Sequence, residues 1–208
     1  PYFQELLDSD IPTVIMDFET TQSHTVCSDN AAGALQAMEY LVSLGHRRIA
    51  HISGGMNTFP GRSRQLGYEK ALEQWDLERK ESYIVTGEFY TLESGYEAMK
   101  QLLQLPEVPT AVFASGDLLA LGAMMAVKDS GLNVPGDISI MGYDDVDLAK
   151  YVTPALTTIR QDTAKLGSEA AEILFASIKE PQKGHTALVL PITIMLRDSC
   201  APPASIER

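Results

Sequence analysis

Short apolar runs alternate with helix-like segments through the middle of the chain, and this alternation constrains the fold more than any other feature. Four runs have the length and apolar character of buried strands, and helix-like segments separate them. The four runs are residues 48–53, 82–85, 110–115 and 137–142. Alternation of strand and helix is typical of a parallel sheet wrapped by helices. We therefore expect an α/β fold with such a sheet over roughly residues 48–145.

The residues on either side of this sheet predict elements of a second lobe. Residues 12–17 have the pattern of a strand, and Asp162 is placed to cap a helix. Residues 188–194 read as one last strand. These elements are too few to close a sheet, so we expect an incomplete amino-terminal lobe and a chain truncated at its start. The expected lobes are residues 1–27 with 163–187 (partial amino-terminal lobe) and 28–161 with 188–203 (carboxyl-terminal lobe).

The charge of the chain argues against one class of partner. The chain has 28 acidic and 16 basic residues among its 208, a formal net charge of -12. So acidic a surface repels phosphate backbones, and any contact with DNA needs a separate basic module. No apolar run approaches the roughly 20 residues that span a bilayer, so we expect no membrane partner. Cys27 and Cys200 lack metal-ligand spacing, which indicates free thiols in a reducing compartment.

Polar and aromatic residues gather where the expected strands end. Ligands of open parallel sheets bind at the carboxyl ends of the strands. The residues near those ends include Asp17, Arg62, Arg64, Phe89, Tyr90, Asp117, Asp144, Asp145 and Gln161. Carboxylates accept hydrogen bonds from vicinal hydroxyls, Arg donates a planar fork, and an aromatic face covers the apolar side of a sugar ring. This mixture predicts a polyhydroxylated ligand in a crevice between two lobes.

Several of these residues have structural alternatives. Asp117 is better explained as the N-cap of its helix, and Asp145 as the cap of a short helix that follows. Phe89 fits core packing as well as ligand contact. Arg62 and Arg64 fit solvated charges of a first helical turn. Cations there oppose the helix dipole, however, which favours a functional reason for at least one of them.

Catalytic and metal sites fit the sequence poorly. The neighbouring carboxylates Asp144 and Asp145 have no His or Lys beside them for acid–base chemistry. The four histidines are scattered, without the spacing of metal ligands. Gly54 and Gly55 do not belong to a phosphate-binding motif, and no serine has an evident base. We therefore expect a binding protein that is not an enzyme and that needs no cofactor or metal.

An ordered set of seven stretches covers nearly the whole chain. They are IPTVIMD (11–17), DNAAGALQAMEYLVSLGHRRIAHISGG (29–55), RSRQLGYEKAL (62–72), PTAVFASGDLLALGAM (109–124), GLNVPGDISIMGYDD (131–145), TPALTTIRQD (153–162) and LRDSCAPP (196–203). Together they resemble the lactose-repressor and galactose-repressor family of bacterial transcription regulators. The resemblance implies a two-lobed effector-binding core of the periplasmic-binding-protein type (type I), working as a homodimer. It also implies a helix-turn-helix headpiece for operator DNA, which this sequence does not contain.

The resemblance also implies particular effector contacts. The family's contacts fall on Asp17, Arg64, Phe89, Asp144 and Gln161. The chain departs from the family at Gly116, where the family usually has Asn and less often another polar residue. We expect this glycine to remove a hydrogen bond and enlarge the pocket, for a larger ligand or an ordered water, which leaves the identity of the effector open.

Dimer contacts are implied in the same way. Family dimers pack through the helix after the third strand and the segment after the fourth, which here carry Leu121, Met125, Tyr151 and Val152. Met125 fits ordinary core packing equally well.

The function expected from these observations is that of a cytoplasmic allosteric sensor. A sugar or sugar derivative favours one angle between the lobes, which sets the spacing of two headpieces on operator DNA. Replacing Asp144 or Arg64 by Ala is expected to abolish the response and leave the fold intact. Two alternatives stay open. One is a secreted sugar-binding protein of a transporter, and the other is a regulator controlled by a protein partner, which Gly116 makes less remote.

Overall fold

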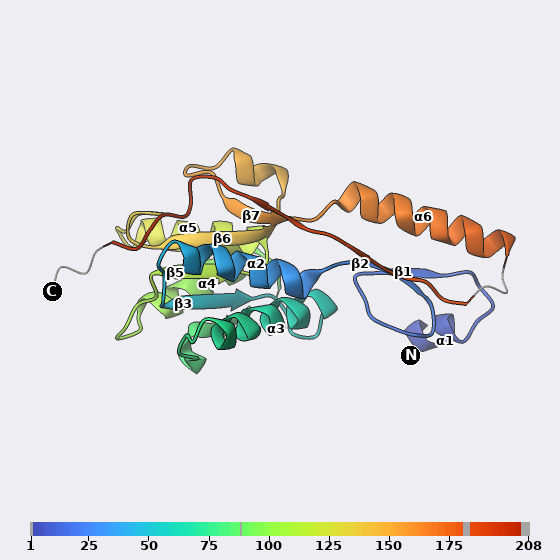
Figure 1. Ribbon diagram of the computed structural model, residues 1–208. Coiled ribbons are helices and arrows are strands. Elements are labelled where there is room, and N and C mark those ends of the chain that lie inside the picture. The colour runs from blue at the N-terminus through green and yellow to red at the C-terminus, as the bar shows by residue number, and fades with distance from the viewer. Residues whose placement is uncertain (1, 88, 181–183, 205–208) are drawn as a thin grey trace. The chain divides into compact units, whose positions relative to one another are not determined.

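Parallel strands form two separate sheets, each in its own unit of the chain. The computed structural model describes residues 2–87, 89–180 and 184–204. Unit 1 consists of Pro1–Asp29 and Gln161–Ile192, and unit 2 of Asn30–Arg160 and Thr193–Arg208. Figure 1 traces the chain through both units. Among the described residues, no helix combines the length and the apolar character needed to cross a membrane.

Unit 2 contains a six-stranded sheet in the order β4-β3-β5-β6-β7-β9. Its strands are β3 (Ile49–Ser53), β4 (Ile84–Thr86), β5 (Ala111–Ala114), β6 (Ser139–Asp144), β7 (Thr157–Arg160) and β9 (Thr193–Met195). All neighbours pair in parallel except β7 and β9, which are antiparallel. The predicted parallel sheet is confirmed, with the second strand beginning two residues later than expected because η1 (Glu81–Tyr83) precedes it.

Four long helices connect and cover these strands. They are α2 (Asn30–Ser43), α3 (Phe59–Gln74), α4 (Leu92–Leu103) and α5 (Asp117–Asp129), with the short 3-10 helix η2 (Asp147–Lys150) after β6. α2 packs against α3, and α4 packs against α5. Thr91 caps α4 by accepting a hydrogen bond from the Ser94 amide at 3.1 Å, so the predicted N-cap is confirmed.

The sheet of unit 2 is buried on both faces. Ala50 and Ile52 of β3 belong to an apolar core that also contains residues of α4 and α5. Between them, His51 points to the other face, where its ring stacks on Tyr68 of α3 and on Phe113 of β5, with ring centroids 4.9 and 5.0 Å apart. Burial lowers the pKa of His51 to about 4, so its ring packs as a neutral group.

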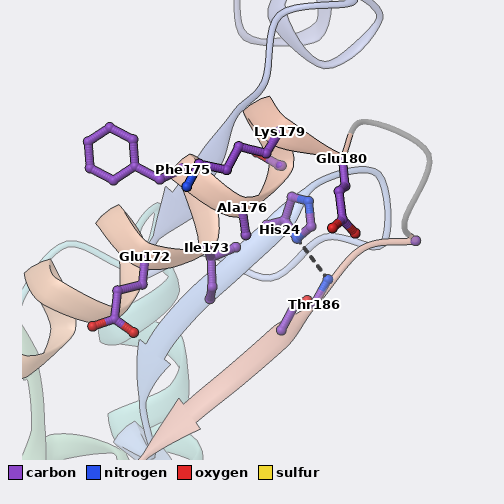
Figure 2. Close-up of a pocket in the computed structure, with 10 residues that line it drawn as sticks. His24, Glu172, Ile173, Phe175, Ala176, Lys179, Glu180 and Thr186 are labelled. Atoms are coloured by element: carbon purple, nitrogen blue, oxygen red, sulfur yellow. Dashed lines mark hydrogen bonds between the residues drawn. The ribbon is translucent and has the colours of Figure 1, made fainter.

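Unit 1 contains a smaller parallel sheet in the order β1-β2-β8. Its elements are α1 (Tyr2–Leu7), β1 (Val14–Met16), β2 (His24–Ser28), α6 (Thr163–Lys179) and β8 (Ala187–Leu190). Asp162 caps α6 through the Lys165 amide at 2.9 Å, as predicted. Next to this sheet lies a cavity of about 430 Å³, where Ile173 and Ala176 of α6 are near His24 and Thr186 (Figure 2).

The prediction of one strand over residues 188–194 is wrong. The structure has two strands there, β8 in the sheet of unit 1 and β9 in the sheet of unit 2, with Pro191 between them. Proline has no amide hydrogen for a strand ladder, which explains the interruption. The expected lobe boundary at 187/188 falls inside β8, whereas the boundary between the units follows Ile192. β2 was not predicted.

The crossing of α4 and α5 depends on two glycines. A methyl group at Gly95 would overlap the carbonyl oxygen of Leu119, and one at Gly122 would overlap that of Leu92. Both obstacles are backbone atoms, which cannot swing aside as a flexible side chain can. The two helices therefore approach each other more closely than any larger residue permits.

We expect Gly122→Ala to lower the free energy of unfolding by about 1–3 kcal/mol, because overpacking outweighs the gain in helix propensity. Gly167→Ala in α6 is the matched control, since nothing lies within 4 Å of a methyl group there. That control is expected to be about 0.5–1 kcal/mol more stable than the wild type. Urea unfolding measures both variants, and equal effects of the two substitutions would contradict the close crossing.

Candidate functional site

The carboxyl ends of four parallel strands meet at one edge of the sheet in unit 2. The register pairs β3 with β4 and β5, and β5 with β6, all in the same direction. Gly54, Gly116 and Asp144 therefore lie at the same edge, as the sequence predicted. Ligands of open parallel sheets bind at this edge, so it is the candidate site.

Arg64 of α3 is the most constrained side chain at this edge. It is 3% exposed, which excludes a solvated charge. Its Nε donates to Asn30 Oδ1 at 2.8 Å, and its Nη1 donates to the Ser115 carbonyl at 2.6 Å. Nη1 also lies 3.2 Å from Asp144 Oδ1, and the guanidinium lies 3.7 Å from the centroid of the Tyr143 ring. One cation thus holds α2, α3, β5 and β6 together.

This position changes what an Arg64 substitution is expected to do. Alanine would remove the donor to Asn30 and to the Ser115 carbonyl, and it would leave Asp144 without its cation. Breaking a buried ion pair by removing one partner typically costs about 3–5 kcal/mol. The expectation that Arg64→Ala leaves the fold intact is therefore not supported, whereas Asp144 is partly exposed and can be replaced with less damage.

Asp144 sits on a backbone turn that side chains rarely adopt. Its φ is 114° and that of Asp145 is 57°, both in the left-handed region. Such residues cost about 1–3 kcal/mol each and cluster where function requires them. Asp17, the predicted contact in unit 1, has the same property with φ 50°.

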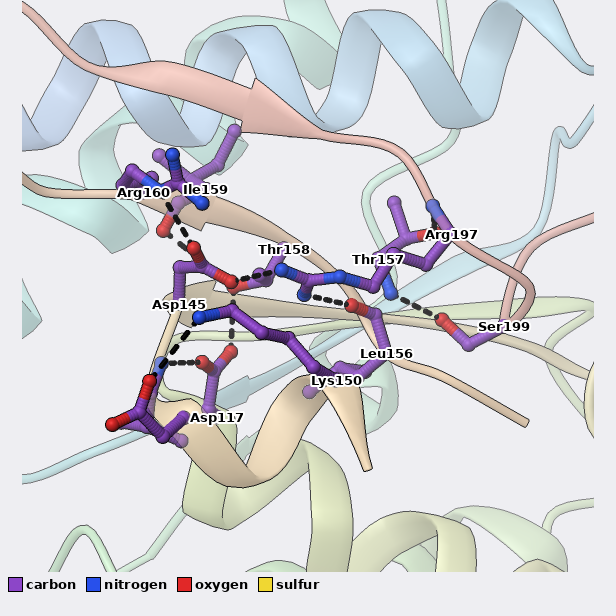
Figure 3. Close-up of polar contacts among 12 residues, drawn as sticks. Asp117, Asp145, Lys150, Leu156, Thr157, Thr158, Ile159, Arg160, Arg197 and Ser199 are labelled. Carbon is purple, nitrogen blue, oxygen red and sulfur yellow. Dashed lines mark hydrogen bonds and ion pairs between the residues drawn. The ribbon is translucent and has the colours of Figure 1, made fainter. Parts of the chain in front are cut away.

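Asp145 stabilises this turn through two arginines. Its Oδ2 accepts from Arg160 Nε at 2.6 Å, and its Oδ1 pairs with Arg197 (Figure 3). Burial alone would raise the pKa of Asp145, but the hydrogen bonds from Arg197 and Arg160 outweigh it and hold the pKa below its ordinary value. The expected helix-capping role is wrong, because the N-cap of η2 is Val146.

Asp117, the first residue of α5, supports the same turn. The N-cap of α5 is Gly116, so the capping role expected of Asp117 is wrong. Its carboxylate instead accepts hydrogen bonds from the Val146 amide at 2.8 Å and from Thr158 Oγ1 at 2.6 Å (Figure 3). Burial raises the pKa of Asp117 to about 7 against these two hydrogen bonds, and the charge of Asp144 raises it further.

The loop after β4 differs from the expectation. Phe89 is 61% exposed, so core packing does not explain it. Its neighbour Tyr90 packs instead against the core of unit 2. A methyl group at Gly116 would lie 2.7 Å from Cδ1 of Tyr90. The space expected from Gly116 is therefore filled by the Tyr90 ring, and the prediction of an enlarged pocket is wrong.

The two remaining predicted contacts belong to unit 1. Asp17 follows β1 and its amide donates to the Val26 carbonyl at 3.1 Å, while Gln161 is the first residue of the second segment of this unit. Neither lines the cavity beside α6, so that cavity is not the predicted site (Figure 2). Over the described ranges, no group of three or more His, Cys, Asp or Glu residues could hold a metal ion.

The expected dimer residues differ in exposure. Met125 is 53% and Tyr151 80% exposed, so Met125 is not a core residue. Leu121 is 5% exposed and belongs to the core of unit 2, against which Val152 also packs. Of these four residues, Met125 and Tyr151 therefore offer the most apolar surface to a partner.

Two supporting residues were not predicted from the sequence. Asn30 begins α2 and binds Arg64, and Arg197 follows β9 and binds Asp145. Each lies more than 30 positions from its partner in the sequence. The packing of α2 against α3 brings the first pair together, and the pairing of β6, β7 and β9 the second, and no local spacing signals either.

Comparison with known proteins agrees with this fold. The family model for a periplasmic binding protein-like domain matches residues 38–200. The chain is 38% identical to the HTH-type transcriptional repressor PurR of Histophilus somni (strain 129Pt) over 192 residues, which cover 91% of this chain and 57% of that repressor. The chain thus spans less than two thirds of the length of this relative.

Two solved structures extend the comparison. A LacI transcriptional regulator from a Rhodococcus species matches with a TM-score of 0.86 and 33% identity, over 96% of this chain and 73% of that chain. A LacI family transcriptional regulator from Enterococcus faecium with bound ribose matches with a TM-score of 0.82 and 31% identity, over 92% and 71% respectively. The chain therefore belongs to the LacI family of transcriptional regulators, with the fold of the periplasmic binding protein-like domain.

Proposed function

We propose that this chain is the effector-binding core of a cytoplasmic, DNA-binding repressor that senses a sugar or a sugar derivative. The observation that carries the proposal is the ion pair between the buried Arg64 and the partly exposed Asp144, which lies on a left-handed turn at the carboxyl edge of a parallel sheet. The ribose bound by the Enterococcus faecium relative supports the ligand class. The site binds and does not catalyse, and operator DNA is contacted through a helix-turn-helix headpiece of the whole protein.

The Asp144 carboxylate is the central ligand group in this proposal. Arg64 orients it, and its partial burial strengthens hydrogen bonds that it accepts from the hydroxyls of a sugar. Asp17 and Gln161 of unit 1, together with Phe89, are proposed as further contacts on the basis of the family resemblance. We also propose that the two units correspond to the two lobes expected from the sequence.

The chain itself provides a route by which ligand binding at Asp144 can affect unit 1. Asp145 follows the ligand group Asp144 directly and binds Arg160, the last residue of unit 2 before the chain passes into unit 1. A ligand that shifts the turn at Asp144 therefore acts on an ion pair that holds this connection. A difference of about 1–3 kcal/mol between two states would be enough for a useful switch.

Asp144→Asn tests the proposed ligand group. Asparagine tolerates the positive φ but carries no charge, so affinity for the bound sugar is expected to fall about 10- to 100-fold without loss of the fold. Calorimetry of the protein against D-ribose, D-glucose and their phosphates measures this effect. Asp137→Asn, which precedes the opposite end of β6, is the control and should bind like the wild type. Normal binding by Asp144→Asn would contradict the assignment.

The carboxyl of Asp117 predicts a pH dependence of stability. Its pKa is raised from 3.8 to about 7, so the folded state holds this proton more tightly than the unfolded state does. This group therefore lowers the free energy of unfolding as pH rises from about 4 to about 7, by a few kcal/mol in order of magnitude.

Asp117→Asn should remove this contribution, because the amide does not ionise; its oxygen can accept from the Val146 amide while its nitrogen donates to Thr158 Oγ1. Urea unfolding at pH 5 and pH 8 measures the effect, and the variant is expected to gain stability relative to the wild type at pH 8. If the difference between the two proteins is the same at both pH values, the proton is not held at Asp117.

The proposed homodimer places Met125 and Tyr151 in its interface. Met125→Glu introduces a buried charge there and is expected to shift the protein from dimer to monomer in sedimentation velocity. Leu66→Glu on α3 is the matched control, since Leu66 is also exposed and lies on another helix. A dimer that persists in Met125→Glu would exclude this interface.

A further inference from the structure

The ring of Tyr90 lies in a groove that two glycines leave open. A methyl group at Gly54 would overlap the hydroxyl end of this ring, and one at Gly116 would lie 2.7 Å from Cδ1. Neither glycine has a positive φ, so neither is required for its backbone conformation. Both serve the close approach of Tyr90, and a side chain at either position would displace the ring.

This groove borders the proposed effector site. The position that a methyl group at Gly116 would take lies 3.6 Å from Asp144 Oδ2, beside the ring of Tyr90. The Gly54 amide donates to Ser115 Oγ at 2.6 Å, next to the carbonyl that binds Arg64. The Tyr90 ring therefore lies against the same loops that hold the ligand-binding carboxylate and its cation.

Packing alone does not explain the hydroxyl of Tyr90. It is buried, and it has no hydrogen-bond partner among the residues that the structure describes. An unpaired buried hydroxyl costs stability, which phenylalanine would avoid with the same ring. This oxygen is sealed from solvent, so no ligand reaches it while the ring stays in the groove, and it is the bulk of the ring that borders the proposed site.

We infer that Tyr90 is a specificity-determining residue that limits the effector to a single sugar ring, an inference that rests on the proposed function. A phenol ring is similar in size to one sugar ring, so it takes the space that the second ring of a disaccharide would need.

Unfolding experiments test the position of the ring without any ligand. Gly54→Ala is expected to lower the urea midpoint in the wild-type background, because the methyl group displaces the Tyr90 ring. The same substitution in a Tyr90→Ala background should have little effect, since no ring is left to displace. Equal effects of Gly54→Ala in the two backgrounds would overturn the inference.

Calorimetry with D-ribose, D-glucose and cellobiose tests the size limit. The wild type is expected to bind a monosaccharide at least about tenfold more tightly than cellobiose, and Tyr90→Ala should reduce this ratio about tenfold. Tyr90→Phe should keep both the ratio and the affinity for the monosaccharide, because the ring has the same size. Tyr96→Ala is the matched control, because Tyr96 also packs on the core of unit 2, and it should keep the wild-type ratio.

The two proposals fail in different ways. If the wild type binds cellobiose as tightly as a monosaccharide, or if Tyr90→Ala leaves the ratio unchanged, the size limit is overturned while the sugar-sensing function stands. If no sugar binds to the wild type or to any variant, the proposed function is overturned and the size limit with it.

Discussion

A single buried guanidinium organises the candidate site. Removing a charge from water is costly unless the group finds opposite charge and hydrogen-bond acceptors, and Arg64 finds both. The planar fork of arginine can serve several acceptors in fixed directions, which lysine cannot do. Its acceptors lie at the start of α2, directly after β5 and at the end of β6, so these three points must meet for the charge to be tolerated. The geometry of the strand ends follows from this requirement.

Two further carboxylates near this point tolerate burial in opposite ways. Asp145 stays charged because two arginines bind it, and its pKa is lowered. Asp117 accepts hydrogen bonds from two neutral donors, which do not outweigh burial, so its pKa rises to about 7. Asp144 and Asp145 form the left-handed turn, and Asp117 binds the Val146 amide directly after it. The ion pairs of Asp145 and the hydrogen bonds of Asp117 hold the backbone of this turn in a conformation that is unfavourable without them.

The sequence predicts the local features of this fold well and the distant contacts poorly. Apolar alternation predicted the parallel sheet, and the caps at Thr91 and Asp162 lie where their spacing placed them. The strand over 188–194 was mispredicted because the apolar run gives no sign of a change of sheet at Pro191.

The same holds for the candidate site: its residues could be predicted from the sequence, but their partners could not. Arg64 and Asp144 were expected near one edge, and the structure brings them into contact. The roles of Asp117 and Asp145 were missed, since their partners Thr158 and Arg197 are distant in the sequence. Which of Phe89 and Tyr90 faces the core depends on two glycines on other loops, and no periodicity in a short loop reveals that choice.

The division of unit 1 between two distant segments has a consequence for synthesis on the ribosome. The strands β1 and β2 are synthesised before the long segment of unit 2, and β8 and the covering helix α6 follow only after about 130 residues of it. At bacterial rates of translation this delay is on the order of ten seconds. During that time β1 and β2 lack α6 and β8, the helix and the strand that pack on them in the folded unit, so unit 1 can be completed only after unit 2 has been synthesised.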